Sequence, residues 1–144
     1  MNHTEQTLMI AIASMDGNDM PKTHFGEAPR FELYRVSVDA AAWQQTVVNP
    51  GADAHQPDHG GHGHGDTGKG AGIGHLLGSH GVEVMVSRAF GANIQRMRQR
   101  FLPIKVDVPT VAEALTLIRA AWPRVVTHWE DGVARKHLVL HGPV

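Results

Sequence analysis

Four histidines lie within ten residues of one another, in a segment rich in glycine and aspartate. Neutral imidazoles bind Zn, Ni, Cu or Fe, and a flexible loop could let two to four of them converge on one ion. Their spacing matches no rigid metal-binding template, and Gly/His-rich inserts also bind metals without a specific site. The segment therefore predicts affinity for Zn, Ni or Cu, with or without a specific site. The candidate metal ligands are His55, His59, His62 and His64.

Glycines in the same segment partly match a nucleotide-binding pattern. Residues 63–69 satisfy the start of G-x-x-x-x-G-K-[ST], but position 70 is a glycine, so the hydroxyl that would hold Mg²⁺ is missing. The preceding expected strand ends near Val48, too far back for a strand–loop–helix cradle. These departures exclude a P-loop, although a Gly-rich backbone before a helix can still receive an anion.

Basic residues are concentrated between Val84 and Val106, where no acidic residue occurs. Arg88 ends an expected strand and precedes Gly91 and Asn93, at the start of an expected helix. Ligands of open α/β sheets bind at the carboxyl ends of the strands. Arg88 is therefore a candidate for contacting an anionic ligand, with a solvated loop position as the alternative. The arginines of the helix itself, expected on a solvated face, are Arg96, Arg98 and Arg100.

His24 is the remaining candidate, in a loop that follows the expected first strand and Asp16. A lone histidine in a loop is usually only a loop residue. However, if the first strand is adjacent and parallel to the strand before Arg88, both side chains lie beyond the same edge of the sheet. That convergence favours a role for His24 in binding a ligand.

Composition restricts the class of protein that these residues serve. A chain of 144 residues predicts one domain, and 13 Lys+Arg against 14 Asp+Glu give no bulk attraction to nucleic acid or anionic lipid. The absence of cysteine excludes disulfides, thiolate nucleophiles and Cys-ligated metal sites. No apolar run reaches the length of a membrane span, and no basic region of a signal peptide occurs, so the predicted location is cytoplasmic.

The elements that must position these residues begin with an opening set of strands. Residues 8–14 form a continuous apolar run, typical of a strand buried on both faces. Strands at 31–38 and 43–48, joined by a short turn, predict an antiparallel hairpin. Residues 1–7 are expected to form a disordered tail, and 49–70 a mobile His/Gly-rich loop that buries too little to become ordered.

Helices and strands alternate in the second half of the chain. Thr110 and Glu113 form a capping box that begins the best-defined helix, and Pro123 is expected to end it. Strand-like runs between 125 and 140 surround Glu130-Asp131-Gly132, which indicates a hairpin. The pattern predicts a three-layer α/β domain over 8–122, a mixed β-sheet with flanking helices, and a C-terminal β-hairpin extension over 123–144. The other expected elements are helices at 71–79 and 91–101 and strands at 82–87 and 104–108.

Several motifs occur in a characteristic order. A strand that ends at Ser14 leads to Asp16-Gly17 and then to His24-Phe25-Gly26. Over about residues 8–121 this order resembles the dinitrogenase iron–molybdenum cofactor biosynthesis family, the NifX-like proteins. The later motifs that carry the resemblance are Gly81-Val82-Glu83-Val84, Gly91 with Asn93, Ile104 to Val108, and Thr110-Val111-Ala112-Glu113-Ala114-Leu115.

The resemblance implies a ribonuclease H-like fold. It also implies a non-catalytic carrier of an anionic metal–sulfur cluster, the iron–molybdenum cofactor or a precursor, in nitrogenase-type assembly for nitrogen fixation. The family histidine proposed to touch the cluster corresponds to His24. A preformed cluster brings its own sulfides, so transient binding needs no cysteine and only one or two weak ligands with positive charge nearby. The candidate cofactor-binding residues are Asp16, His24, Phe25, Gly26, Arg88, Gly91 and Asn93.

Two other functions compete with a cluster carrier. The first is a divalent metal-handling protein that uses the His-rich loop. The second is a nuclease, which would need several carboxylates around metal ions, whereas the first strand carries none and only Asp16 lies at its end. Expected partners are cofactor-assembly or nitrogenase-type proteins, with no nucleic acid and no membrane. A strand edge or the C-terminal hairpin could also mediate a homodimer.

Overall fold

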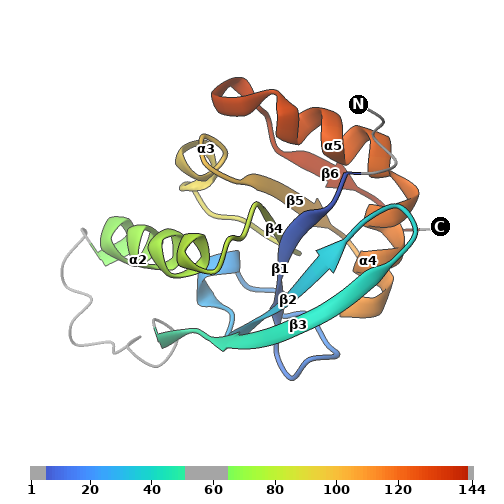
Figure 1. Cartoon of the computed structure of the whole chain (residues 1–144). Helices are drawn as coiled ribbons and strands as arrows, with labels where there is room; N and C mark the ends of the chain where they lie inside the picture. Colours follow the sequence, from blue (N-terminus) through green and yellow to red (C-terminus); the bar gives the residue numbers. More distant parts are fainter. Residues whose placement is uncertain (1–5, 51–64, 143–144) are drawn as a thin grey trace.

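Six strands form one mixed sheet in the order β3-β2-β1-β4-β5-β6 (Figure 1). The computed structural model describes residues 6–50 and 65–142, with the backbone alone for 65–71. Strands β1, β4, β5 and β6 run parallel, while β2 is antiparallel to β1 and β3 is antiparallel to β2. The strands are β1 (Leu8–Ser14), β2 (Arg30–Val36), β3 (Ala41–Val48), β4 (Val84–Ser87), β5 (Leu102–Val106) and β6 (Leu138–Leu140).

Strand β1 is covered on both faces, as its continuous apolar sequence predicts. Ile10 and Ile12 belong to one buried core cluster, and Ala11 and Ala13 belong to the other. Alternate side chains of a strand point to opposite faces of the sheet, so the two clusters lie on opposite sides of β1. The predicted three-layer arrangement is confirmed.

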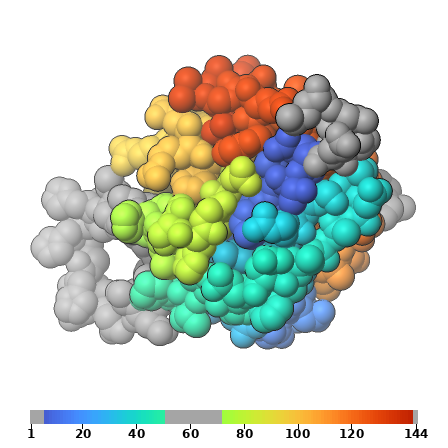
Figure 2. Space-filling view, viewed as in Figure 1, coloured from blue at the N-terminus to red at the C-terminus, as the bar shows by residue number. Residues whose placement is uncertain are grey.

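Helices cover the two faces of the sheet separately. On the Ile10 side, α4 (Val111–Ala120) and α5 (Trp122–Glu130) pack on the sheet. On the other side lie α2 (Gly65–Ser79), the short η2 (Phe25–Glu27) and α3 (Ile94–Met97), whose side chains join or pack against the second core cluster. Figure 2 shows α2 in green beside β3 in cyan and the gold segment around α3. No helix in the described part of the chain is long and apolar enough to cross a bilayer.

The predicted bounds of the loop over 49–70 are wrong at both ends. Asn49 is buried, and its side-chain amide donates hydrogen bonds to the carbonyls of Gly26 and Ala28 at 2.9 and 2.8 Å. Helix α2 begins at Gly65 rather than at residue 71, so it includes glycines that the sequence analysis assigned to the loop. Its end is as predicted: Gly81 has a φ of +77°, and the Val82 amide bonds back to the Leu77 carbonyl, as in a Schellman motif.

The predicted C-terminal hairpin is also wrong. Pro123 does not end a helix but occupies the first turn of α5, a position that tolerates a residue without an amide hydrogen. A 3-10 turn, η4 (Gly132–Ala134), follows α5, and β6 then pairs in parallel with β5. Buried side chains at 122, 125 and 126 join the core on the Ile10 side. The segment at 123–144 thus supplies a helix and the sixth strand of the same sheet.

Strand β3 forms one edge of the sheet. The pairing of β2 with β3 shifts register between Leu33 and Tyr34, which leaves Gln44 as an extra residue in β3. The side-chain amide of Gln44 donates a hydrogen bond to the Ala42 carbonyl at 3.0 Å. Bulges of this kind blunt sheet edges against pairing with another chain. The homodimer stays a prediction.

Candidate functional site

The candidate site lies at the carboxyl ends of β1 and β4. These strands are adjacent and parallel, with Ile10 opposite Val84, so the condition for His24 and Arg88 to share a sheet edge is met. The chain leaves β1 for β2 on one side and later returns to β4 on the other side. Such a reversal of strand order is where ligands bind in open α/β sheets.

Backbone pairing fixes His24 against the loop that follows β4. His24 forms an isolated parallel bridge with Ala89, whose carbonyl accepts a hydrogen bond from the Phe25 amide at 3.0 Å. The His24 amide donates to a carboxylate oxygen of Glu27 at 3.2 Å. The exposed imidazole lies so close to Gly91 that a Cβ atom there would be 2.9 Å from its Nδ1 atom. His24 is therefore held by its backbone while its ring remains accessible.

Phe25 and Gly26 support His24 rather than face solvent beside it. Phe25 is 1% exposed, and its ring stacks on Phe31 and Phe90 with centroid separations of 4.7 and 5.6 Å. This ring anchors η2 in the second core cluster. Gly26 offers its carbonyl to the Asn49 amide, and no atom of the described residues lies within 4 Å of the position of an added Cβ. Of the three residues in the His-Phe-Gly motif, His24 has the side chain best placed to meet a ligand.

The close contact between Gly91 and His24 gives a first test of this geometry. In Gly91→Ala, the new methyl group should displace the imidazole, because an approach of 2.9 Å is too short and the ring is exposed and able to turn. We expect the NMR resonance of the His24 Hε1 proton to move, while the free energy of unfolding changes by less than about 1 kcal/mol.

Gly26→Ala is the matched control, because Gly26 lies in the same segment as His24 and its added methyl group meets no described atom within 4 Å. It should leave the His24 resonance in place. The geometry described for Gly91 would be contradicted if the two variants moved the resonance equally.

Arginine and asparagine side chains flank the same loop. Arg88 is half-buried beside Ala89, and its guanidinium makes no hydrogen bond or ion pair with any described residue. Asn93 is half-buried at the start of α3, and its carbonyl accepts hydrogen bonds from the amides of Arg96 and Met97. Arg88 thus provides positive charge at the edge that carries His24, without an acidic neighbour from 84 to 106.

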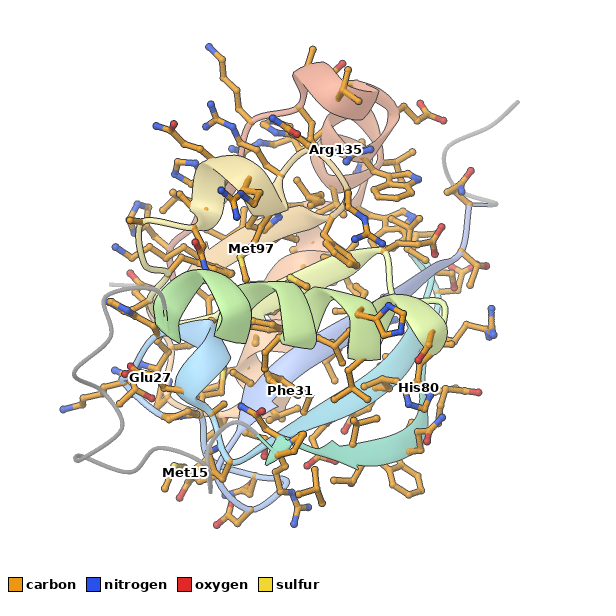
Figure 3. The ribbon with its side chains drawn as sticks, turned by 90° about the vertical axis from the view of Figure 1, so that its left-hand side faces the viewer. Met15, Glu27, Phe31, His80, Met97 and Arg135 are labelled. Atoms are coloured by element: carbon orange, nitrogen blue, oxygen red, sulfur yellow. The ribbon has the colours of Figure 1, made fainter. Side chains whose placement is uncertain are left out.

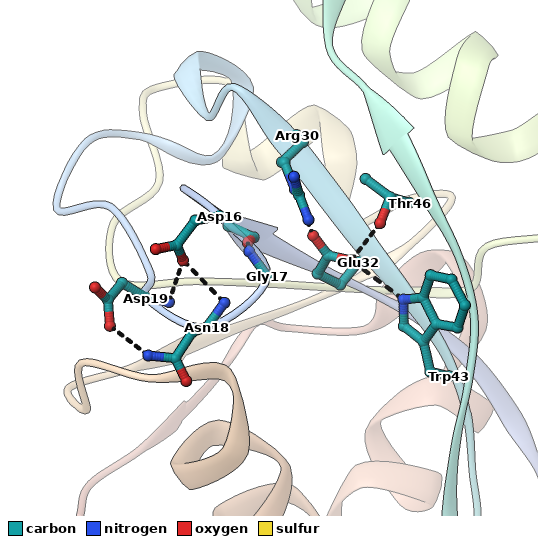
Figure 4. Close-up of polar contacts among 9 residues, drawn as sticks. Asp16, Gly17, Asn18, Asp19, Arg30, Glu32, Trp43 and Thr46 are labelled. Atoms are coloured by element: carbon teal, nitrogen blue, oxygen red, sulfur yellow. Dashed lines mark hydrogen bonds and ion pairs between the residues drawn. The ribbon is translucent and has the colours of Figure 1, made fainter.

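Asp16 has a structural task in the turn after β1 (Figure 4). One of its carboxylate oxygens accepts hydrogen bonds from the amides of Asn18 and Asp19 at 2.9 and 2.8 Å. These hydrogen bonds lower the pKa of the exposed Asp16 carboxyl below its ordinary value, and the bond from the Asp19 amide has the largest effect. The turn docks on the segment before α4 through an isolated bridge between Asp19 and Thr110. Asp16 holds the loop that leads toward His24.

A buried carboxylate beside this turn was missed by the sequence analysis. Glu32 is 2% exposed and accepts hydrogen bonds from Arg30, Thr46 and Trp43 at 2.7, 2.6 and 3.2 Å (Figure 4). Burial alone would raise the pKa of Glu32, but these donors outweigh it and hold the pKa below its ordinary value. The Arg30 guanidinium also lies 3.0 Å from where a Cβ atom of Gly17 would stand. The cluster therefore supports the turn that precedes His24.

The predicted metal ligands His55, His59, His62 and His64 lie outside the described residues. Among the residues that the structure does describe, no three His, Asp or Glu side chains gather in a way that could hold a metal ion. The described candidates are thus single side chains at a sheet edge, among which the His24 ring is exposed and the Arg88 side chain is half-buried.

Fold and site together define a three-layer α/β protein with a histidine and an arginine at the carboxyl ends of two central parallel strands. The sequence model of the dinitrogenase iron–molybdenum cofactor family matches residues 6–121, and the chain belongs to this family. The family is involved in nitrogenase-related biosynthesis of the iron–molybdenum cofactor and is associated with binding or carrying rather than with catalysis. No curated protein matches the chain.

Proposed function

We propose that the protein is a non-catalytic carrier that transiently binds an anionic metal–sulfur cluster, the iron–molybdenum cofactor or a precursor. The observation that carries the proposal is the accessible His24 imidazole, fixed by the His24–Ala89 bridge at the strand-order reversal. Membership of the cofactor family supports the class of cargo. The sheet order, with β2 antiparallel to β1, supports the assignment to a ribonuclease H-like fold.

The chemistry of the edge suits reversible binding. One imidazole can ligate a metal atom of the cluster, and the Arg88 guanidinium can offset its negative charge. A single protein ligand gives a site from which the cargo can leave, whereas four thiolates would retain it. Cargo delivered to this edge would pass to a cofactor-assembly or nitrogenase-type partner in the cytoplasm.

The test is a titration of untagged protein with isolated iron–molybdenum cofactor under anaerobic conditions, followed by visible absorption, metal content and acid-labile sulfide. We expect one cluster per chain and at least about tenfold weaker binding by His24→Ala, the loss of roughly 1.4 kcal/mol or more. His75→Ala is the matched control, because His75 is an exposed histidine on α2. It should bind like the wild type.

Deletion of residues 55–64 separates the carrier from a divalent metal-handling protein. A carrier that uses His24 keeps its cluster binding after the deletion. If the deletion abolishes metal binding while His24→Ala has no effect, the carrier proposal is wrong and the His-rich loop is the functional part. In that case the protein would bind Zn, Ni or Cu without sulfide.

A further inference from the structure

A surface hollow of about 340 Å³ lies over α3, beside the candidate site. This volume is within the lower part of the range of about 300–1,000 Å³ found for small-molecule sites, but the hollow is open to solvent and lined mainly by polar groups. The hollow begins one residue after Gly91, the glycine that contacts the His24 ring. Figure 3 shows α3, which carries Met97, with nitrogen-tipped side chains projecting from it. The lining residues are Ala92, Asn93, Gln95, Arg96 and Gln99.

The arginines around α3 have different environments. Arg100 packs its guanidinium 5.5 Å from the centre of the Phe101 ring, and Arg135 is buried, bonded to the carbonyls of Trp129 and Arg98. Arg96 is exposed and lines the hollow, and its guanidinium makes no hydrogen bond or ion pair within the described part of the chain. The donors of Arg96 are therefore available to a ligand, whereas Arg100 and Arg135 serve packing.

The remaining polar side chains around the hollow are uncharged amides. Residues 92, 95, 96 and 99 recur at three- and four-residue spacing, which places them on one side of a helical turn. The guanidinium of arginine matches the two oxygens of a carboxylate in a forked, charge-assisted pair, and amides of glutamine can donate to further oxygens. No acidic residue between 84 and 106 competes for the guanidinium. This lining fits a small anion whose oxygens accept hydrogen bonds, such as a carboxylate.

We propose that the hollow is a binding site for a small organic carboxylate, held by Arg96 and the neighbouring amides of Gln95 and Gln99. We take a free small molecule as the occupant, because the volume holds one, and an acidic side chain of a partner protein is the alternative that the test distinguishes. Binding needs neither His24 nor a metal–sulfur cluster. The proposed carboxylate site is therefore independent of the proposed carrier function.

Citrate is the probe for this site. In an NMR titration of the ¹⁵N-labelled full chain, saturable shifts are expected for amides at 92–99 and not for those of α5. Arg96→Gln should weaken citrate binding at least about tenfold, and Arg96→Lys, which keeps the charge but loses the forked geometry, should weaken it at least about threefold. Arg124→Gln is the control, since Arg124 is exposed on α5, and it should bind like the wild type.

Three results would overturn the proposal. Citrate binding that Arg96→Gln leaves unchanged would place the ligand elsewhere. Equal affinity for sulfate at the same ionic strength would show general anion attraction rather than recognition of a carboxylate. Shifts at 92–99 with a glutamate-rich peptide but not with citrate would assign the hollow to a protein partner. Because cluster binding is absent from this experiment, its failure leaves the carrier proposal untouched.

Discussion

Phe25→Ala should lower the free energy of unfolding by about 3–5 kcal/mol, the usual cost of removing a fully buried phenylalanine. The ring is 1% exposed and stacks on both Phe31 and Phe90, so the substitution leaves a cavity under η2 and removes two aromatic contacts. The measurement is urea denaturation followed by far-UV circular dichroism, with the slope of the transition compared between variants.

Phe90→Ala is the matched control for Phe25→Ala. Phe90 is half-buried and stacks on Phe25 alone among the described rings, so its removal should cost less, about 1–2 kcal/mol. Equal small losses for the two variants would mean that Phe25 does not anchor the segment.

The effect of Phe25 should extend to the candidate site. Its amide donates the hydrogen bond to Ala89 that places His24 beside β4, so loss of the ring loosens the same short segment that orients the imidazole. In a chain of marginal stability, a loss of several kcal/mol lowers the folded population as well as the affinity. Cluster binding by Phe25→Ala should therefore be compared with that of the wild type in the absence of urea, at a temperature where circular dichroism still shows the folded state.

Local sequence signals predicted much of the fold, because strand burial and helix capping depend on residues that are close together in the sequence. Residues 8–14 form the observed β1. A strand with apolar side chains on both sides must be buried on both faces, so its sequence shows no alternation of polar and apolar residues. Thr110 accepts a hydrogen bond from the Glu113 amide and begins α4, as the capping box indicates. His24 was predicted as a site residue from the order of motifs and from the expected adjacency of two strands. The pairing of β1 with β4 confirms that adjacency.

The C-terminal part was misread although a signal was present. Trp122, Val125, Val126 and Trp129 recur at i, i+3, i+4 and i+7, which is the stripe of a buried helix face. Pro123 predicts the end of a helix, but proline is also compatible with the first turn of a helix, because the amide at that position has no intrahelical partner. The hairpin signal at Gly132 reflects a real turn, with a φ of +64°, but it joins a helix to a strand.

The Glu32 cluster could not be predicted, because it depends on contacts between different strands. In the sequence, Glu32 is one polar residue in an alternating strand, with no sign that it is buried. Its partners Thr46 and Trp43 come from β3, and a register shift in that pairing decides which side chains meet. Register depends on the global pairing of strands rather than on local pattern. The same reason applies to the contact between His24 and Gly91.

Glu32→Gln should destabilise the protein by about 1–3 kcal/mol at pH 7, because it removes the charge of a buried carboxylate that accepts three hydrogen bonds, while the Arg30 partner is 34% exposed and stays partly solvated. The neutral amide can still accept from Thr46 or Trp43, but it presents a donor where the Arg30 Nε atom needs an acceptor at 2.7 Å. Urea denaturation at pH 7 measures the loss. Asp39→Asn is the control, because Asp39 is an exposed carboxylate in the turn between β2 and β3, and it should change stability by less than about 0.5 kcal/mol.

The pH dependence identifies the carboxylate as the cause. The pKa of Glu32 is lower in the folded protein than its ordinary value of 4.5, so the folded state keeps this carboxylate ionised where the unfolded chain takes up a proton. Its contribution to stability is complete above pH 4.5 and is lost as the pH falls through the folded-state pKa. The difference between wild type and Glu32→Gln should therefore be constant from pH 7 to pH 5 and shrink below pH 4.5. A difference that stayed constant down to pH 3 would mean that lost packing, and not lost charge, destabilises the variant.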